Sequence, residues 1–279
     1  MDISWYHKAT MKQNQNLQKL KDKTFILQLE IKVEDIKKEY QQQLKIAQAN
    51  FENKGFRKGK APLEVVEANI SAEKLFEEVA SHLISHAYGH ALDENKLKPI
   101  IQPQVKFKND HPDFEHDWQI EITSCELPEI ELNSKYLDEV KKINTDKKIT
   151  DENQKMDQII KSIVANTKLD LPPILIESDL QSHLSGLINQ ASQAGITVQQ
   201  YLESQKQTLD GYKESLRKRI IEEWTINLAI SQIAKDNKIE VSDAEIKDLL
   251  DKNPALSKNI NMVYYLLTQQ KVFEFLKKQ

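Results

Sequence analysis

Glycine is scarce in this chain, with six residues in 279, well below the usual frequency of about 7%. Because glycine permits tight turns and a close backbone approach to phosphates, this scarcity disfavours folds rich in nucleotide-binding loops or short hairpins. Long helices fit the composition better. The single cysteine, Cys125, excludes an internal disulfide and an all-cysteine metal site, which is consistent with a reducing compartment.

Long apolar runs and a basic excess are also missing. The longest apolar runs, such as 263–267, have about five residues, whereas about 20 are needed to span a bilayer. Residues 1–10 have no apolar stretch typical of a secretory signal, so we expect a cytoplasmic protein without a membrane partner. The 39 Lys and Arg residues against 43 Asp and Glu residues give a net charge of −4, which argues against broad electrostatic wrapping of nucleic acid.

The first half of the chain switches between two hydrophobic periods. Alternating apolar residues predict the extended segments 3–7 (Ile3, Trp5, His7), 24–31, 100–107 and 114–122. Apolar residues at helical spacing predict the helices 33–51, 62–70 and 72–92. Pro99 and Pro103 place the third extended segment at a sheet edge. This order favours an α+β domain, residues 1–132, with an antiparallel sheet and helices on one face.

The second half is interpreted as helical. A charged segment without glycine, 133–148, is interpreted as a partly helical linker. From 149 to 279 the apolar residues recur at helical spacing, which predicts an all-α domain. Thr197 with Gln200, and Ser242 with Glu245, have the spacing of capping boxes at helix starts.

The densest positive charge lies in the segment 54–60, which holds Lys54, Arg57, Lys58 and Lys60 without an acid. Its two glycines permit a tight excursion of the chain, Arg57 can bind phosphates, and Phe56 can stack on a base or enter an apolar pocket. A solvated basic turn between two helices explains the same pattern equally well. A phosphate-binding P-loop fits poorly, because the glycine spacing is one residue short and Ala61 replaces the Ser or Thr.

The same segment resembles a known signature. Residues 55–62 match the G-F-R-x-G-K-x-P motif of trigger factor, a ribosome-associated bacterial chaperone; the matching positions are Gly55, Phe56, Arg57, Lys58, Gly59, Lys60 and Pro62. Segments 127–132, 170–180 and 217–233 are also similar to this family. The resemblance implies an ATP-independent chaperone without a cofactor. It also implies that Phe56, Arg57 and Lys58 occupy the tip that docks beside the exit tunnel.

The resemblance implies partners as well. They are the large ribosomal subunit, through ribosomal RNA and an exit-tunnel protein, and unfolded or nascent polypeptides; a homodimer is left open. Full-length members resemble a three-part protein with an FKBP-like prolyl isomerase domain between the two regions. Here the chain passes from Leu132 to Ile149 without room for that domain, so we expect a short form that is not an enzyme. The alternatives are a ribosome-associated adaptor without chaperone activity and, as the least favoured, an active prolyl isomerase.

Three histidines form the other candidate site. His82, His86 and His90 are spaced by four residues and therefore share one helix face, where neighbouring pairs could chelate a transition metal. No Cys residue or His-Glu-x-x-His pattern supports a metal site, so a packed or solvated helix face is favoured. Adjacent carboxylates such as Glu77 and Glu78 point to different helix faces. Hence we predict no metal site and no catalytic residue, and we interpret Cys125 as a packed side chain.

Overall fold

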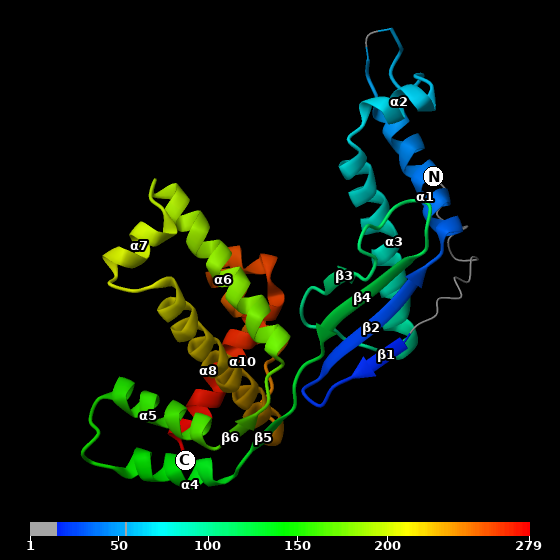
Figure 1. Ribbon diagram of the computed structural model, residues 1–279. Helices are drawn as coiled ribbons and strands as arrows, with labels where there is room; N and C mark the ends of the chain where they lie inside the picture. Colours follow the sequence, from blue (N-terminus) through cyan, green and yellow to red (C-terminus); the bar gives the residue numbers. More distant parts are fainter. Residues whose placement is uncertain (1–15, 54) are drawn as a thin grey trace. The chain divides into compact units, whose positions relative to one another are not determined.

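The computed structural model describes residues 16–53 and 55–279. The predicted strand at Ile3, Trp5 and His7 lies outside the described residues, as does Lys54. The chain divides into two compact units, Met1–Leu127 and Pro128–Gln279. In Figure 1 the first is coloured from blue to green and the second from green to red. This division falls earlier in the chain than the expected end of the first domain at Leu132.

The first unit contains a four-stranded antiparallel sheet in the order β1-β2-β4-β3. Its strands are β1 (Asn16–Lys19), β2 (Thr24–Ile31), β3 (Gln104–Phe107) and β4 (Trp118–Cys125). β2 coincides with the predicted segment, and β3 lies at an edge as its prolines indicate. β4 begins later than predicted, because Asp113 Oδ1 accepts hydrogen bonds from the Glu115 and His116 amides and holds that segment in a turn.

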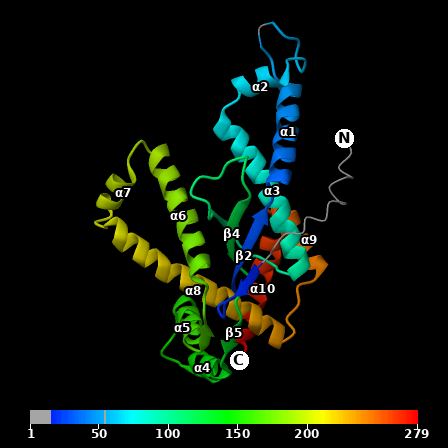
Figure 2. The same cartoon turned by 45° about the vertical axis from the view of Figure 1, so that its right-hand side comes forward.

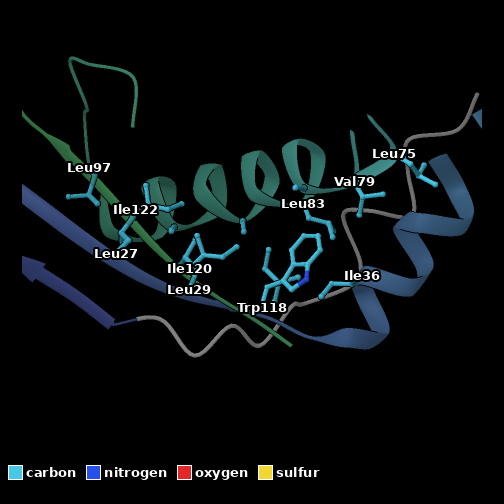
Figure 3. Packing of buried hydrophobic residues seen from close by; sticks show 14 of the residues in the cluster. Leu27, Leu29, Ile36, Leu75, Val79, Leu83, Leu97, Trp118, Ile120 and Ile122 are labelled. Atoms are coloured by element: carbon cyan, nitrogen blue, oxygen red, sulfur yellow. The ribbon is translucent and has the colours of Figure 1, made fainter. Parts of the chain in front are cut away.

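Three helices accompany this sheet: α1 (Val33–Asn50), α2 (Leu63–Asn69) and α3 (Ala72–Asn95). α3 lies along one face of the sheet, as Figure 1 shows. Figure 3 shows the Trp118 ring beside Leu83 of α3, with Leu29 and Ile120 lying between their strands and this helix. Alternate residues of β2 and β4 are buried in this core, which explains the period of two in both segments. The prediction of an antiparallel sheet with helices on one face is confirmed.

The second unit is mainly helical. Its helices are α4 (Lys135–Thr145), α5 (Glu152–Ala165), α6 (Pro173–Gln193), α7 (Val198–Ser204), α8 (Leu209–Asp236), α9 (Asp243–Lys252) and α10 (Ile260–Lys277), with a 3-10 helix at Pro254–Lys258. A short antiparallel pair, β5 (Ile130–Leu132) with β6 (Thr167–Leu169), adds a small β element to this helical unit. Both predicted capping boxes are present, at Thr197 and Ser242. Within the residues that the structure covers, no helix is both long and apolar enough to cross a membrane.

The segment 133–148 belongs to the second unit. It contains α4, whose Tyr136 and Val140 are buried in a core shared with α5, α8 and α10. α8 takes part in two cores: Ala229, Ile230 and Ile233 pack in the core around α4, while its first half packs against α6 through Leu216 and Ile220. In Figure 2, α6 and the first half of α8 form an arm, with α7 at its end.

Candidate functional site

The basic segment forms the connection between α1 and α2. In Figure 1 it lies beyond the ends of both helices, at the end of the first unit that is remote from the sheet. Phe51 ends α1, and Pro62 directly precedes α2. Residues 55–60 of the signature are therefore displayed on a helical support, away from the sheet.

Backbone geometry explains both glycines of the signature. Gly55 has φ +107° and Gly59 has φ +71°, a region that favours glycine because other residues meet steric strain there. The Gly59 amide donates to the Phe51 carbonyl oxygen at 3.2 Å, so the loop folds back onto the end of α1. A Cβ atom on Gly59 would lie 3.2 Å from the Ala49 carbonyl oxygen. The positive φ angles at both positions, and the close contact with Ala49 at Gly59, therefore explain why the loop has glycine there.

Further hydrogen bonds hold the loop at its base. The Gln48 side-chain amide donates to the carbonyl oxygen of Ala61 at 2.6 Å, and Ala61 itself is buried. The hydroxyl of Tyr40 donates to a carboxylate oxygen of Glu67 on α2. Burial, together with this hydrogen bond, raises the pKa of Tyr40 to about 12. These contacts join α1 to α2 and fix the direction in which the loop leaves the helices.

The side chains of the loop face solvent. Phe56 is 42% exposed, which is unusual for a phenylalanine and leaves its ring available to a partner. Arg57, Lys58 and Lys60 are exposed as well, and Lys58 Nζ lies 3.3 Å from Glu52 Oε1. With an exposed aromatic ring beside several cations, the loop can bind a polyanion through its cations and an apolar site on a partner through the ring. This arrangement suits binding rather than acid–base catalysis.

Of the candidate histidines on α3, His82 contacts a neighbouring helix. His82 Nδ1 lies 3.0 Å from Glu39 Oε1, and Glu39 on α1 is 2% exposed and also accepts from Gln43 Nε2 at 2.7 Å. His90 instead lies near Glu94 on its own helix, at 3.7 Å. Across residues 16–53 and 55–279, no three His, Cys, Asp or Glu side chains are grouped so that they could hold a metal ion. His82 therefore links α3 to α1.

Two apolar surfaces were not identified from the sequence. A hollow of about 500 Å³ lies between α1 and the start of α3; its apolar lining includes Ile46, Phe51, Ile70 and Leu75. In the second unit, a hollow of about 590 Å³ is lined by Val198, Leu202 and Leu209 where α7 meets α8. Helical periodicity finds apolar faces but does not separate core from exposed residues, which is why these surfaces were missed.

The helical unit also exposes isolated apolar side chains. Ile188 on α6 is 55% exposed, Leu209 is 45% exposed, and Ile221 on α8 is 42% exposed. All three belong to the α6–α7–α8 arm or its connections. Amide side chains such as Gln190 and Gln207 line the neighbouring hollows. The arm thus offers a mixed apolar and amide surface.

Comparison with known proteins gives consistent matches. A region of 144 residues is 32% identical to trigger factor of Agathobacter rectalis, covering 47% of this chain and 32% of that protein. Trigger factor of Clostridium perfringens is 37% identical over 89 residues, which cover 30% of this chain and 20% of that protein. The matched regions thus span about a third or less of these curated relatives.

A solved structure of the trigger factor chaperone, described for promiscuous substrate recognition in folding and assembly, has a similar fold. Its TM-score is 0.60 at 13% identity, with 95% of this chain and 99% of that chain covered. Residues 13–163 match the family model for bacterial trigger factor protein, and residues 138–279 match the model for its C-terminus. Since each model matches more than half of the sequence, the chain belongs to the bacterial trigger factor family.

Proposed function

We propose that this chain is an ATP-independent chaperone that docks on the ribosome near the exit tunnel and shields nascent or unfolded polypeptides. The observation that carries the proposal is the signature loop, residues 55–62, presented at the end of the first unit with Phe56 exposed. Its backbone is held by contacts to α1, so the exposed side chains are preorganised for binding. Family membership supports the same function.

Docking would combine two kinds of contact. Arg57 and Lys58 would bind phosphates of ribosomal RNA, and the Arg57 guanidinium can do so with two parallel hydrogen bonds. Phe56 would enter an apolar site on an exit-tunnel protein. Because each phosphate contact releases counterions, the docking affinity should fall as the salt concentration rises. The loop would thus act as a local anchor on a chain whose net charge is −4.

Client binding would use the helical unit. The exposed apolar side chains Ile188, Leu209 and Ile221 can contact apolar segments of an unfolded chain, while neighbouring amides can bind its backbone. Each contact is weak. Docking near the exit tunnel would raise the effective concentration of emerging segments, so many weak contacts would shield them without trapping them.

The proposal includes no enzymatic activity and no cofactor. The two family matches overlap over residues 138–163, which leaves no intervening segment for a prolyl isomerase domain between them. The charged side chains of residues 55–62 are Arg57, Lys58 and Lys60, which fit binding of an anionic partner. We therefore assign ribosome docking and client shielding as the functions, and we do not assign proline isomerisation.

The docking proposal is tested by changing Phe56, Arg57 and Lys58 together to Ala. We expect co-sedimentation with ribosomes at low salt to be lost while the melting curve stays unaltered, because all three side chains are exposed. A matched control changes Ile100, Lys98 and Lys21 to Ala; these are also one apolar and two basic exposed residues of the same unit. Ribosome binding that survives the loop substitution unchanged would refute the docking proposal.

A further inference from the structure

Positive charge continues from the signature loop into α1. Residues 37–60 hold seven Lys and Arg residues and two acidic ones, whereas the whole chain has a net charge of −4. Three of the seven, Lys37, Lys38 and Lys45, lie on α1 itself and all are exposed. The basic character of this region is therefore wider than the signature motif.

Of the two acids within 37–60, one is buried and the other lies beyond the end of α1. Glu39 is 2% exposed and faces His82 of α3 at 3.0 Å, so its carboxylate is directed into the unit. Glu52 lies beyond the end of α1 and contacts Lys58. From Lys38 to Asn50, the solvent-facing side of α1 carries lysines and amides together with Ile46, which is 51% exposed, and it has no exposed carboxylate.

The arrangement of these side chains follows from helix geometry. Lys38 and Lys45 are seven residues apart, which places them two turns and about 10.5 Å apart along the same helix face. Gln41 and Gln42 lie between them, and together with Lys37 these residues line one shallow concavity of about 650 Å³. Lys37 Nζ lies 2.5 Å from Glu115 and Lys38 Nζ lies 3.4 Å from Asp35. We call Lys38, Gln41, Gln42 and Lys45 the α1 basic face.

The α1 basic face and the signature loop belong to one structural piece. The loop returns onto the last turn of α1, where Gly59 donates to Phe51 and approaches Ala49. Gln48, one turn after Lys45, holds the carbonyl oxygen of Ala61. A partner held by the loop therefore meets the helix face at a fixed orientation.

We propose that the α1 basic face is a second contact for RNA, which binds the sugar–phosphate backbone of a folded RNA beside the segment held by the loop. Lysines spaced along the face match phosphates, and the glutamine amides between them can donate to phosphate oxygens and pair with 2′-hydroxyls. The four residues of the face are polar or basic, and the exposed Ile46 beside them is a single apolar side chain, less than a membrane surface or a protein interface would require. This inference rests on the proposed ribosome docking and extends the surface that performs it.

The test uses the double variant Lys38→Gln and Lys45→Gln in the full chain. Binding is measured to salt-washed ribosomes and to an RNA hairpin of about 20 base pairs, each over a series of KCl concentrations. We expect the slope of log affinity against log salt to fall by about two, with about tenfold weaker binding near 0.1 M salt. The variant Lys38→Arg with Lys45→Arg keeps both charges and should restore the slope.

A control for net charge changes Lys21 and Lys98 to Gln. Both are exposed lysines of the same unit outside the α1 basic face, and we expect this variant to keep the original slope. Unchanged slopes for the Lys38 and Lys45 variant with both RNA probes would overturn the inference. Loss of binding only to anionic lipid vesicles would overturn it too, because a membrane would then be the partner.

The outcomes separate this inference from the docking proposal. If the Phe56, Arg57 and Lys58 variant still binds ribosomes, the docking proposal fails. The salt dependence of hairpin binding still tests the contribution of Lys38 and Lys45 in that case. If the loop variant loses ribosome binding but the double lysine variant binds both probes as before, docking stands and the inference about α1 is refuted.

Discussion

Gly59 approaches the last turn of α1 so closely that an added Cβ atom would lie 3.2 Å from the carbonyl oxygen of Ala49. The same residue has φ +71°, and its amide donates to the Phe51 carbonyl oxygen. Gly59 therefore combines a close contact with Ala49, a positive φ angle and a hydrogen bond to Phe51. This contact connects the shape of the signature loop to α1, although Gly59 itself has no side chain to offer a partner.

Changing Gly59 to Ala should weaken ribosome docking without altering any side chain proposed to contact the ribosome. Alanine at a positive φ costs about 1 kcal/mol, and the contact with Ala49 adds to that strain. We expect a lower affinity in ribosome co-sedimentation and a slightly lower melting temperature. Gly89→Ala is the matched control, because Gly89 lies inside α3 with open space around its Cβ position and should raise stability. Equal docking by the wild type and the Gly59 variant would contradict the prediction.

Asp117 is expected to stabilise the start of α1. Its Oδ1 accepts from the Val33 amide at 2.8 Å and its Oδ2 accepts from Lys32 Nζ at 2.9 Å, which lowers the pKa of Asp117. Lys32 at the N-cap position makes no side-chain cap, so Asp117 supplies the missing acceptor. Asp117→Ala should cost about 1 kcal/mol and speed amide hydrogen exchange in the first turn of α1.

Asp117→Asn serves as the comparison, because it keeps an oxygen acceptor for the Val33 amide and removes only the charge. We expect a smaller loss of stability, since an exposed ion pair contributes at most about 1 kcal/mol. Hydrogen exchange that is equally fast in the Asn and Ala variants would show that the charge, and not the cap, stabilises the helix start.

Glu245 should make the contact between α9 and α10 sensitive to acid. Its carboxylate accepts from Lys271 and from Ser242, which lowers the pKa of Glu245 to about 2 from its ordinary 4.5. Because the folded-state pKa is depressed, this stabilisation is present above pH 4.5 and is lost as the pH falls from 4.5 towards 2. The melting temperatures of wild type and Glu245→Gln should therefore differ at pH 7 and converge towards pH 2. A constant difference across this range would rule out the ion pair as the cause.

Client shielding should depend on the exposed apolar side chains of the α6–α7–α8 arm. Ile188→Ser combined with Leu209→Ser should reduce the suppression of aggregation of a chemically unfolded test protein, because both side chains are exposed and apolar. The fold should tolerate both changes, as exposed substitutions usually alter stability by less than about 0.5 kcal/mol. Ile100→Ser in the first unit is the control and should leave suppression unchanged. Full suppression by the double variant would place client binding elsewhere, and a wild-type chain that suppresses nothing would favour the adaptor alternative.

Segments with a strong local pattern could be predicted from the sequence. β2 has apolar residues at alternate positions except for Ile26, and this alternation predicts a strand at 24–31. Helical spacing predicts α1 to within one residue of its end. The capping boxes at Thr197 and Ser242 were also predicted, because each depends on residues three positions apart. In these cases the information lies within a few residues of the chain.

Segments whose own residues show no clear apolar period are not predicted by the sequence. β1 has one apolar residue, Leu17, in four and therefore no alternation; it forms because the turn at Leu20 to Thr24 brings it beside β2. β6 pairs with β5 although more than thirty residues separate them in the chain. The charged segment 133–148 contains Tyr136 and Val140, which are buried because α5, α8 and α10 surround them. Such pairings and burials depend on the fold and leave little trace in local sequence.

The sequence by itself determined the family signature, its glycines and the helices on either side, since these depend on residue type and short spacing. Only the tertiary structure decided which charges and apolar side chains reach solvent. Glu39 faces His82, so its carboxylate does not lie on the outer side of α1. Gly59 packs against Ala49, and this contact holds the loop against the last turn of the same helix. Burial is set by neighbours that are distant in sequence, so a helical stripe shows the same period whether it faces a core or a partner.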